Sequence, residues 1–405
     1  MMLRGFKIDT RIRNIQTMEL LDAVAEFETK LLPMVPEDIL PERAKSAAPW
    51  YRSPKQLAHI FYNELQIKPV YSDRGTPTTG KKALPILAKR EPIIKPIIDS
   101  ISKLRSLKVF YGTFLQAELD PDNRMRCSFN VAGTETFRWS SSKNPFGRGT
   151  NFQNIPKGNE QIQGVSFPNV RKLFTPDPGY LLVAADLSGA DAQVVAWESG
   201  EEELKNALKS GIKLHSVVAK ELYGTDGQPH YDMCKRRIHA TNYGGGARTL
   251  HQTLLGQYGP EHTSEAAERS FQKYWFTRYP GVKDWHERVT DSLKAIHGVT
   301  NQFGNRIIYQ DRLDSVFPNA LAWIPQSTVA FVCLRGAMLI ADKFPFCELL
   351  CQVHDEIVFQ LPKSKRNYLS EIHGALNTIE VPYPDPLRIP WGFDVSDKSW
   401  GHCYE

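Results

Sequence analysis

Three things are scarce in this sequence: paired cysteines, long apolar runs and a strong excess of either charge. The 405 residues include six cysteines, with no CxxC pair and no zinc-type spacing, so we expect reduced, packed thiols inside a cell. No apolar run approaches the length of a membrane span, which argues against a membrane protein. Internal repeats and low-complexity tracts are absent as well, which excludes solenoids and disordered chains.

The beginning of the sequence carries no targeting signal. Residues 1–9 lack the apolar core of a signal peptide, and Asp9 comes too early for a typical transit peptide. We therefore expect a cytoplasmic protein. The composition, 41% hydrophobic and 23% charged residues, is typical of a globular protein. The length of 405 residues allows two or three subdomains. The net charge of +5 agrees with an anionic partner without demanding one.

Two aspartates stand at the ends of strand-like apolar runs that are far apart in the sequence. Leu349–Gln360 predicts a strand, a tight turn and a strand, with Asp355 in the turn, and Asp186 ends the apolar run 180–185. Carboxylates are poor strand residues, so each aspartate marks either a solvated turn or a cation site. If the strands neighbour each other in one sheet, the two carboxylates can hold a pair of metal ions about 3.5–4 Å apart for phosphoryl transfer.

A basic helix is predicted shortly after the first aspartate. Lys235, His239 and Tyr243 recur every four residues and share one helix face, with Arg236 at its edge. A cation, an imidazole and an aromatic ring in line could meet a triphosphate at one end and a sugar or base at the other. The three glycines 244–246 are either an ordinary helix cap or a hinge.

Further stretches have an ordinary interpretation beside a functional one. Residues 92–115 predict a long basic helix, which is usually only solvated but could follow a phosphate backbone. Residues 129–156 have a loop-like composition, although their Arg, Ser, Asn and Gln side chains are those that contact sugars, phosphates and the minor groove. A lone His215 on a helix would normally be structural. Other helices are predicted over 18–34, 190–199, 264–297 and 327–342.

Several segments, in the right order, resemble motifs of the family A DNA polymerases, the polymerase I type. The resemblance covers nearly the whole chain, and so many ordered matches make coincidence a poor explanation. The matching segments are Ser53–Leu57, Ser106–Lys108 with Tyr111, Thr134–Arg138 with Ser140 and Ser141, Asn151–Pro156, Asp186–Asp191, Lys235–Gly244, Gln326–Thr328, Val353–Glu356, and the region from Pro386 to Trp400.

The resemblance implies an α+β right-hand polymerase fold with an antiparallel-sheet palm, helical fingers and a helical thumb. The implied domains are an N-terminal supporting segment (1–44), the thumb (45–128), the first part of the palm (129–191), the fingers (192–314) and the second part of the palm (315–405). Too few residues precede the Ser53 motif for a 3′→5′ exonuclease domain, so we expect this activity to be missing.

Carried over residue by residue, the resemblance also implies a site. Asp186, Asp355 and the Leu187 carbonyl would hold two Mg²⁺ ions, with Mn²⁺ as a substitute, and Glu356 would support them. The incoming nucleotide would meet Leu187, Ser188, Asp191, His215, Lys235, Arg236, His239 and Tyr243, with Tyr243 stacking on it. Primer and template would meet Lys108, Arg138, Asn151, Gln153, Gln326 and His354.

The chain departs from the family pattern at positions that bear on chemistry. Asp191 stands where the family has a glutamate that senses the ribose, which predicts weaker exclusion of ribonucleotides. His239 stands at the lysine that is thought to protonate pyrophosphate, so we expect the imidazole to be the general acid. Tyr243 in place of phenylalanine predicts acceptance of dideoxynucleotides. Ala247 leaves control of the templating base open, and the lengthened loop 144–149 has no evident role.

We therefore expect template-directed DNA synthesis, in which dNTPs are added to a primer 3′-hydroxyl by two-metal phosphoryl transfer. Two alternatives stay open: a single-subunit RNA polymerase-like enzyme and a catalytically inactive nucleic-acid-binding protein. Expected partners are primer–template DNA and dNTPs, with a separate exonuclease, helicase or primase, or processivity factor, and no membrane. We expect a monomer in the cytoplasm of a bacterium or a phage-infected cell, and an organelle is also compatible with the sequence.

Overall fold

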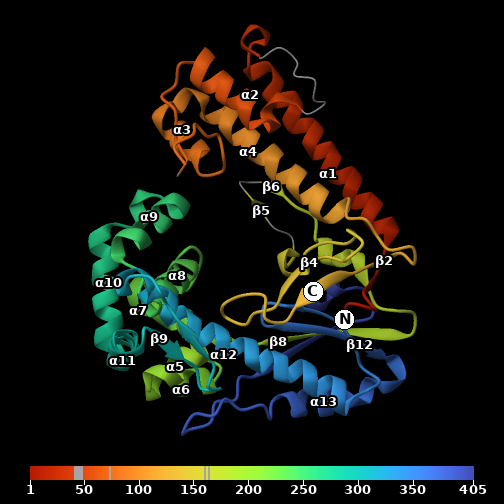
Figure 1. The fold of residues 1–405 in the computed structure, drawn as a ribbon, viewed down its shortest axis with the longest axis vertical. Helices are drawn as coiled ribbons and strands as arrows, with labels where there is room; N and C mark the ends of the chain where they lie inside the picture. Colours follow the sequence, from red (N-terminus) through yellow and green to blue (C-terminus); the bar gives the residue numbers. More distant parts are fainter. Residues whose placement is uncertain (41–48, 73, 159–160, 163–164) are drawn as a thin grey trace. The chain divides into compact units, whose positions relative to one another are not determined.

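The computed structural model describes residues 1–40, 49–72, 74–158, 161–162 and 165–405 (Figure 1). The chain divides into two compact units. Unit 1 contains Met1, Phe129–Ser141 and Gly179–Val395, and unit 2 contains Met2–Ser128, Ser142–Pro178 and Ser396–Glu405. The predicted fingers fall in unit 1 and the described part of the predicted thumb in unit 2, while the predicted palm contributes to both. The boundary expected at 44/45 lies outside the described residues, and the division into thumb, palm and fingers stays a prediction.

Unit 1 is built on a four-stranded sheet in the order β11–β12–β8–β13. The strands are β8 (Tyr180–Leu187), β11 (Glu348–Val353), β12 (Glu356–Pro362) and β13 (Trp391–Ser396). Strands β8 and β12 are antiparallel, with Glu356 opposite Asp186. Most residues of β8 and β12 are buried, which explains why both read as nearly continuous apolar runs.

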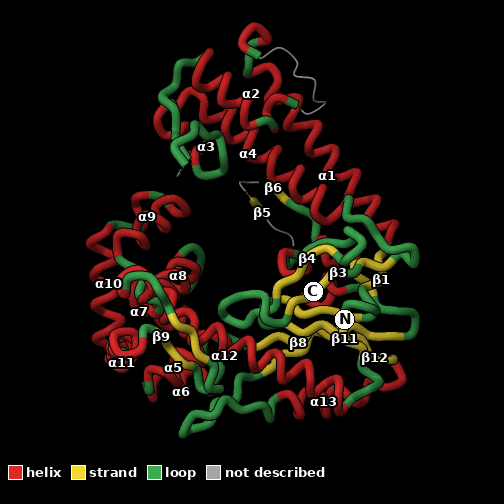
Figure 2. Tube along the Cα trace, in the orientation of Figure 1, coloured by secondary structure: helices red, strands yellow, loops and turns green. Residues whose placement is uncertain are grey.

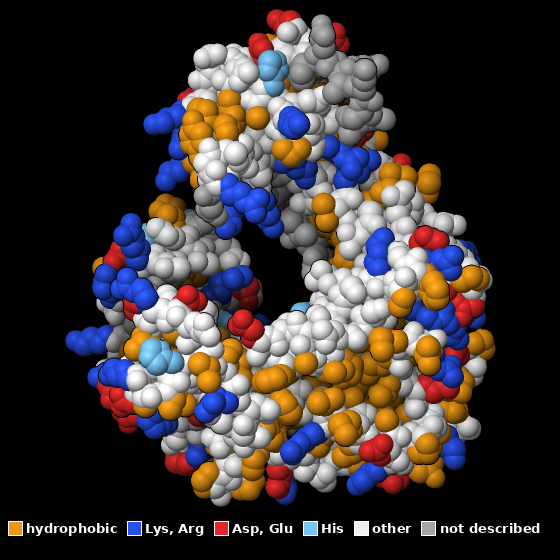
Figure 3. Space-filling model, in the orientation of Figure 1, with side chains coloured by type: hydrophobic (Ala, Val, Ile, Leu, Met, Phe, Trp, Pro, Cys, Tyr) orange, Lys and Arg blue, Asp and Glu red, His pale blue; other side chains and the backbone are white. Residues whose placement is uncertain are grey.

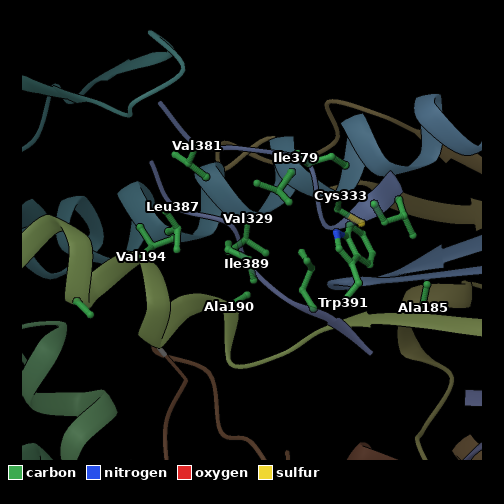
Figure 4. Close-up of a cluster of buried hydrophobic side chains, with 14 of the residues drawn as sticks. Ala185, Ala190, Val194, Val329, Cys333, Ile379, Val381, Leu387, Ile389 and Trp391 are labelled. Carbon is green, nitrogen blue, oxygen red and sulfur yellow. The ribbon is translucent and has the colours of Figure 1, made fainter. Parts of the chain in front are cut away.

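Two helices, α12 (Leu313–Lys343) and α13 (Leu369–Leu376), lie along this sheet (Figure 2). Gly336 of α12 faces the Trp391 ring so closely that a Cβ atom there would lie 2.8 Å from it. Figure 4 shows how Val329 and Cys333 of α12 meet Ala185 of β8 and Trp391 of β13 in one apolar cluster. This packing fixes the sheet beneath the strand ends that carry the aspartates.

The helix α12 corrects two expectations. It begins at Leu313, well before the predicted 327, and it continues through Pro318 and Pro325 because apolar side chains on that stretch are packed in the core. By length and composition alone, α12 is also long and apolar enough to cross a membrane, contrary to the expectation that no run approaches such a length. Its apolar window is 61% buried within the structure, as in the core helix of a globular protein.

The helices between β8 and α12 also belong to unit 1. They are α5 (Ala190–Ser199), α6 (Glu202–Lys209), α7 (Leu214–Tyr223), α8 (His230–Asn242), α9 (Ala247–Tyr258), α10 (Glu265–Arg278) and α11 (Pro280–Ile296), followed by the hairpin of β9 (Gly298–Thr300) and β10 (Arg306–Ile308). The predicted helix 264–297 is two helices, because Pro280 begins α11 directly after Tyr279. Helix α8 starts five residues before Lys235, at His230, and ends before the glycines.

Unit 2 combines long helices with a small sheet. The helices are α1 (Thr10–Leu31), α2 (Pro54–Ala58), α3 (Ala83–Arg90) and α4 (Lys95–Phe110), and the sheet places β1 (Phe6–Ile8) between β2 (Arg124–Met125) and β7 (Phe174–Thr175). Asp9 caps α1, which therefore begins before the predicted Met18. Lys and Arg side chains lie at the edges of a hydrophobic patch around α3 (Figure 3), and the last turn of this helix carries Lys89 and Arg90.

Short strands complete the description. They are β3 (Cys127–Asn130), β4 (Ser140–Lys143), β5 (Gln161–Ile162) and β6 (Val165–Ser166). Antiparallel sheets together with separate helices confirm the predicted α+β class.

The loop 144–149, for which the sequence indicated no role, is an ordered turn of unit 2 that the Asn144 side chain stabilises. The Asn144 side-chain oxygen accepts hydrogen bonds from the backbone N–H groups of Phe146 and Arg148, each at 3.0 Å, while its amide donates to Asp120. A Cβ atom at Gly149 would lie 1.8 Å from the Arg126 carbonyl oxygen, so only glycine fits there.

Candidate active site

The structure brings the two predicted aspartates together at one end of the unit 1 sheet. The turn between β11 and β12 holds Asp355, and His354 beside it has a positive φ of 56°. Since Asp186 is opposite Glu356 in the β8–β12 register, Asp355 lies next to the end of β8. The Leu187 N–H donates to the Asp355 carbonyl at 3.3 Å, and this bond holds the turn against the end of β8.

The electrostatics of this strand end favour a cation. Burial, and after it the neighbouring Asp186 carboxylate, raises the pKa of Asp355 to about 6, and the Asp191 and Glu356 carboxylates act in the same direction. Glu356 is 3% exposed. Because several carboxylates gather here, a bound divalent cation would relieve their mutual repulsion.

The donor atoms fit a hard cation such as Mg²⁺. Two carboxylates and the Leu187 carbonyl oxygen are the oxygen ligands that this ion prefers, and Mg²⁺ usually keeps positions for water and phosphate oxygens. Among the described residues, no group of three or more His, Cys, Asp or Glu side chains could hold a metal ion. A metal pair at Asp186 and Asp355 would therefore depend on oxygens from a substrate or solvent as well.

A cavity of about 620 Å³ opens beside Asp355 within unit 1. Its walls come from α5, α7, α8 and α12 and from the segment before β4, together with the turn at His354. The predicted site residues in its lining are Arg138, Asp191, His215, Lys235, Arg236, His239, Tyr243, His354 and Asp355. The structure therefore gathers one cluster from segments that are separated by more than two hundred residues in the sequence.

Sequence reasoning missed eight residues of this lining: Gly189, Ala190, Ala192, Val195, Asp232, Ile238, Asn242 and Val329. Asp232 lies in the first turn of α8, three residues before Lys235 and therefore on a neighbouring face. If the predicted helix had begun at His230 instead of Lys235, Asp232 would have been recognised as a neighbour of Lys235. Val329 had no polar signal, because it is one apolar residue of a long apolar helix.

Helix α8 is oriented by its buried side. Arg237, which is 3% exposed, donates from Nε to Glu268 of α10 at 2.8 Å and from Nη2 at 2.6 Å. Asn242 accepts a hydrogen bond from the Trp275 indole N–H at 2.9 Å. These contacts turn the exposed Lys235 and His239 toward the cavity.

The predicted sharing of one helix face is confirmed by a ring contact. The His239 and Tyr243 rings meet edge to face with centroids 4.5 Å apart. The two residues differ in exposure, since His239 is exposed and Tyr243 is 9% exposed and packed with Trp285, Val289 and other apolar residues. The stacking of Tyr243 on a nucleotide stays a prediction.

Two of the imidazoles in the cavity, those of His215 and His239, have lowered pKa values. Burial, followed by the positive charge of Lys235, lowers the pKa of His215 to about 4. Partial loss of solvent within the cavity also lowers the pKa of the His239 ring, although the Asp191 carboxylate opposes this shift. At pH 7 the positive charge on this face of α8 therefore comes from Lys235 and Arg236.

Asp191 occupies the first turn of α5, just after the left-handed Gly189. Its carboxylate lies 4.0 Å from the Arg138 guanidinium. Burial, and then the Asp191 charge, raises the pKa of the Tyr243 hydroxyl. In the segment that carries Arg138, the Glu135 carbonyl accepts a hydrogen bond from the Trp323 indole N–H at 2.7 Å. Asp191 therefore interacts with both Arg138 and Tyr243 in the cavity lining.

Other predicted site residues lie outside the cavity lining. Leu187 is buried, and the Ser188 N–H donates to the Pro390 carbonyl at 2.8 Å. Gln326 is a half-buried residue of α12. Three residues belong to unit 2: Lys108 on α4, and Asn151 and Gln153 in a short 3₁₀ turn where the Asn151 side chain accepts from the Gln153 N–H at 2.9 Å.

Comparisons with known proteins agree on one family. The sequence model of DNA polymerase family A matches residues 40–400. DNA polymerase I of Treponema pallidum is 29% identical over 86% of this chain and 34% of its own length. The thermostable DNA polymerase I of Thermus aquaticus is 26% identical over 98% of this chain and 46% of its own length. The chain thus spans about a third to just under half of these relatives.

A solved structure has a similar fold. The POL domain of Pol1 from M. smegmatis, in complex with DNA primer-template and dNTP, superposes with a TM-score of 0.77 at 22% identity. The match covers 99% of this chain and 68% of that one. This likeness confirms the predicted polymerase fold.

Proposed function

Because the chain belongs to DNA polymerase family A, we propose that it adds dNTPs to the 3′-hydroxyl of a primer under the direction of a DNA template and releases pyrophosphate. The observation that carries the proposal is the juxtaposition of Asp186 and Asp355 beside a cavity that presents Lys235 and Arg236. Carboxylates at one end and cations at the other suit a metal-bound triphosphate.

Asp186 and Asp355, with the Leu187 carbonyl, would hold two Mg²⁺ ions, and Mn²⁺ would substitute for them. When bound, such a pair activates the attacking hydroxyl and stabilises the leaving oxygen. The buried Glu356, opposite Asp186, would hold the strand ends in register. The rest of the chemistry falls to side chains that bind the nucleotide, orient it and move a proton.

The exposed face of α8 would bind the triphosphate. Lys235 and Arg236 supply permanent positive charge, and neutral His215 can donate one hydrogen bond from its ring. At the other end of the cavity, Asp191, Tyr243 and the backbone near Ser188 would meet the sugar. Arg138, Gln326 and His354 of unit 1, and Lys108, Asn151 and Gln153 of unit 2, would contact primer and template.

His239 would protonate the pyrophosphate as it leaves. Its pKa is lowered in the free protein, but the negative charge of a bound triphosphate acts in the opposite direction and favours the protonated ring. Lys235, one turn earlier on the same face, is the second candidate for this role. The lowered pKa of His239 favours Lys235, because a neutral imidazole is a poorer proton donor. The pH dependence of the single-turnover rate distinguishes the two candidates.

Primer extension tests the proposal against its two alternatives. With a labelled primer–template, the wild-type chain is expected to extend the primer with dNTPs and far less with NTPs, and Asp355→Asn is expected to bind DNA without extending it. Asp342→Asn, at an exposed position of α12, is the matched control. Preference for NTPs would support the RNA polymerase-like alternative. DNA binding without extension by the wild-type chain would support the inactive one.

A further inference from the structure

Unit 2 contains a buried arginine that no part of the proposed mechanism uses. Arg171 lies in the 3₁₀ turn η8 (Val170–Leu173) and is 3% exposed. Its Nε donates to the Pro156 carbonyl at 3.0 Å, and its Nη2 donates to the Ile155 carbonyl at 3.3 Å. One guanidinium thus binds two successive backbone carbonyls at the end of the Asn151–Pro156 segment.

The other side of the guanidinium is held by the turn η11 (Trp400–Tyr404). The Trp400 ring lies 3.9 Å from the guanidinium carbon, and the Tyr404 hydroxyl accepts from Nη1 at 2.6 Å. The Trp400 indole N–H donates to the same hydroxyl at 2.8 Å. Trp400 is fully buried against Phe6 and Phe174. The turn η11 is therefore a rigid support for Arg171.

Two further contacts tie η11 to its surroundings. The Lys157 ammonium lies 4.4 Å from the centre of the Tyr404 ring, so the residue directly after Pro156 also rests on this turn. Gly401 packs so closely on η8 that a Cβ atom would lie 2.7 Å from the Lys172 nitrogen. The Lys172 side chain pairs with Glu405 at 2.6 Å.

We propose that Arg171, supported by η11, is a positioning residue for the DNA contacts of Asn151 and Gln153. The inference rests on the proposed function, which assigns DNA to these two amides. Asn151 caps the short turn Phe152–Asn154, and the carbonyls that Arg171 binds follow this turn directly. Fixing both carbonyls fixes the direction in which the turn presents its side chains.

The chemistry of arginine explains why another cation would not serve. A planar guanidinium donates two hydrogen bonds in fixed directions and can stack on an indole at the same time. A lysine keeps the charge and a cation–π contact, but its single ammonium cannot reproduce this fork. Arg171→Lys therefore removes the alignment while it keeps the charge in place.

The test measures DNA and nucleotide separately. For Arg171→Lys we expect the Kd and KM for primer–template to rise about tenfold, corresponding to about 1.4 kcal/mol of lost alignment. We expect the KM for dNTP, and kcat at saturating DNA, to stay at the wild-type values. Lys30→Ala, which breaks an exposed ion pair with Glu26 on α1, is the control and should leave all four constants unchanged.

A double-mutant cycle distinguishes positioning from general stability. If Arg171 acts through Gln153, then Arg171→Lys should weaken DNA binding much less in a Gln153→Ala background than in the wild type. Equal losses in both backgrounds, or a parallel fall in kcat and dNTP binding, would overturn the proposal. If Arg171→Lys does not fold, Tyr404→Phe, which removes only the accepting hydroxyl, is used in the same cycle.

The outcome also separates this inference from the proposed function. A wild-type chain that binds no primer–template in an anisotropy measurement overturns both. A wild-type chain that extends primers normally, with a DNA affinity that Arg171→Lys and Tyr404→Phe leave unchanged, overturns the positioning role alone.

Discussion

In the proposed function, Asp191 is the residue whose side-chain length bears most directly on the choice between deoxyribose and ribose. It stands in the first turn of α5 with its carboxylate 4.0 Å from Arg138 and near the buried Tyr243. A glutamate, longer by one methylene, would reach further toward a sugar in the cavity. The shorter side chain therefore leaves space that a ribose 2′-hydroxyl could occupy.

We predict that Asp191→Glu raises discrimination against ribonucleotides about tenfold, since one methylene in a close-fitting site is worth about 1–3 kcal/mol. The measurement is the ratio of kcat/KM for a dNTP to that for the matching NTP in single-nucleotide incorporation. Equal or better discrimination by the wild-type chain would show that Asp191 does not limit sugar access.

His239 offers a test of the proton donor. Its lowered pKa means that the ring is neutral at pH 7 in the free chain, and it can act as an acid only when a bound triphosphate favours the protonated form. The single-turnover rate should then fall as pH rises through the pKa of the complex. His239→Gln should remove this limb and slow the reaction about 10²-fold. An unchanged rate and pH profile would transfer the role to Lys235.

At the scale of elements, the orientation of α8 depends on one buried ion pair. Arg237 and Glu268 have 4% and 0% exposed side chains and are joined by two hydrogen bonds. Removing one partner leaves a buried charge without compensation, which is costly in a medium of low dielectric constant. The pair therefore fixes the face of α8 on which Lys235 and His239 are exposed.

We predict that Glu268→Gln lowers the free energy of unfolding by about 3–5 kcal/mol, measured by urea denaturation. Glu265→Gln is the matched control on the same helix, because its partner Arg269 is exposed and such pairs contribute below about 1 kcal/mol. Similar small losses in both variants would mean that the buried pair does not hold α8.

The elements also explain which predictions succeeded. Asp186 and Asp355 could be brought together from the sequence because each ends a buried apolar strand, and buried strands pair with one another. The bounds of α12 could not, since Pro318 and Pro325 suggest a helix end, whereas packing of the flanking apolar residues keeps the helix continuous. Local patterns do not contain this tertiary contribution.

At the scale of the whole molecule, each unit is assembled from three segments that are separated in the sequence. Residues 142–178 and 396–405, predicted as palm, are compact with unit 2. Arg171 illustrates why the sequence did not indicate these contacts, because an arginine between Val170 and Lys172 forms no motif. Only the fold places it against Trp400 and the carbonyls of Ile155 and Pro156.

The central claim is that Asp186 and Asp355 act together as the metal-binding pair of a DNA polymerase. Rapid-quench measurement of single-nucleotide incorporation at saturating DNA tests it most directly, with Asp186→Asn, Asp355→Asn and the double variant. We predict that each single change lowers the rate by about 10³ or more, that the double variant loses little beyond this, and that DNA affinity is retained. A single variant within tenfold of the wild-type rate would contradict the claim.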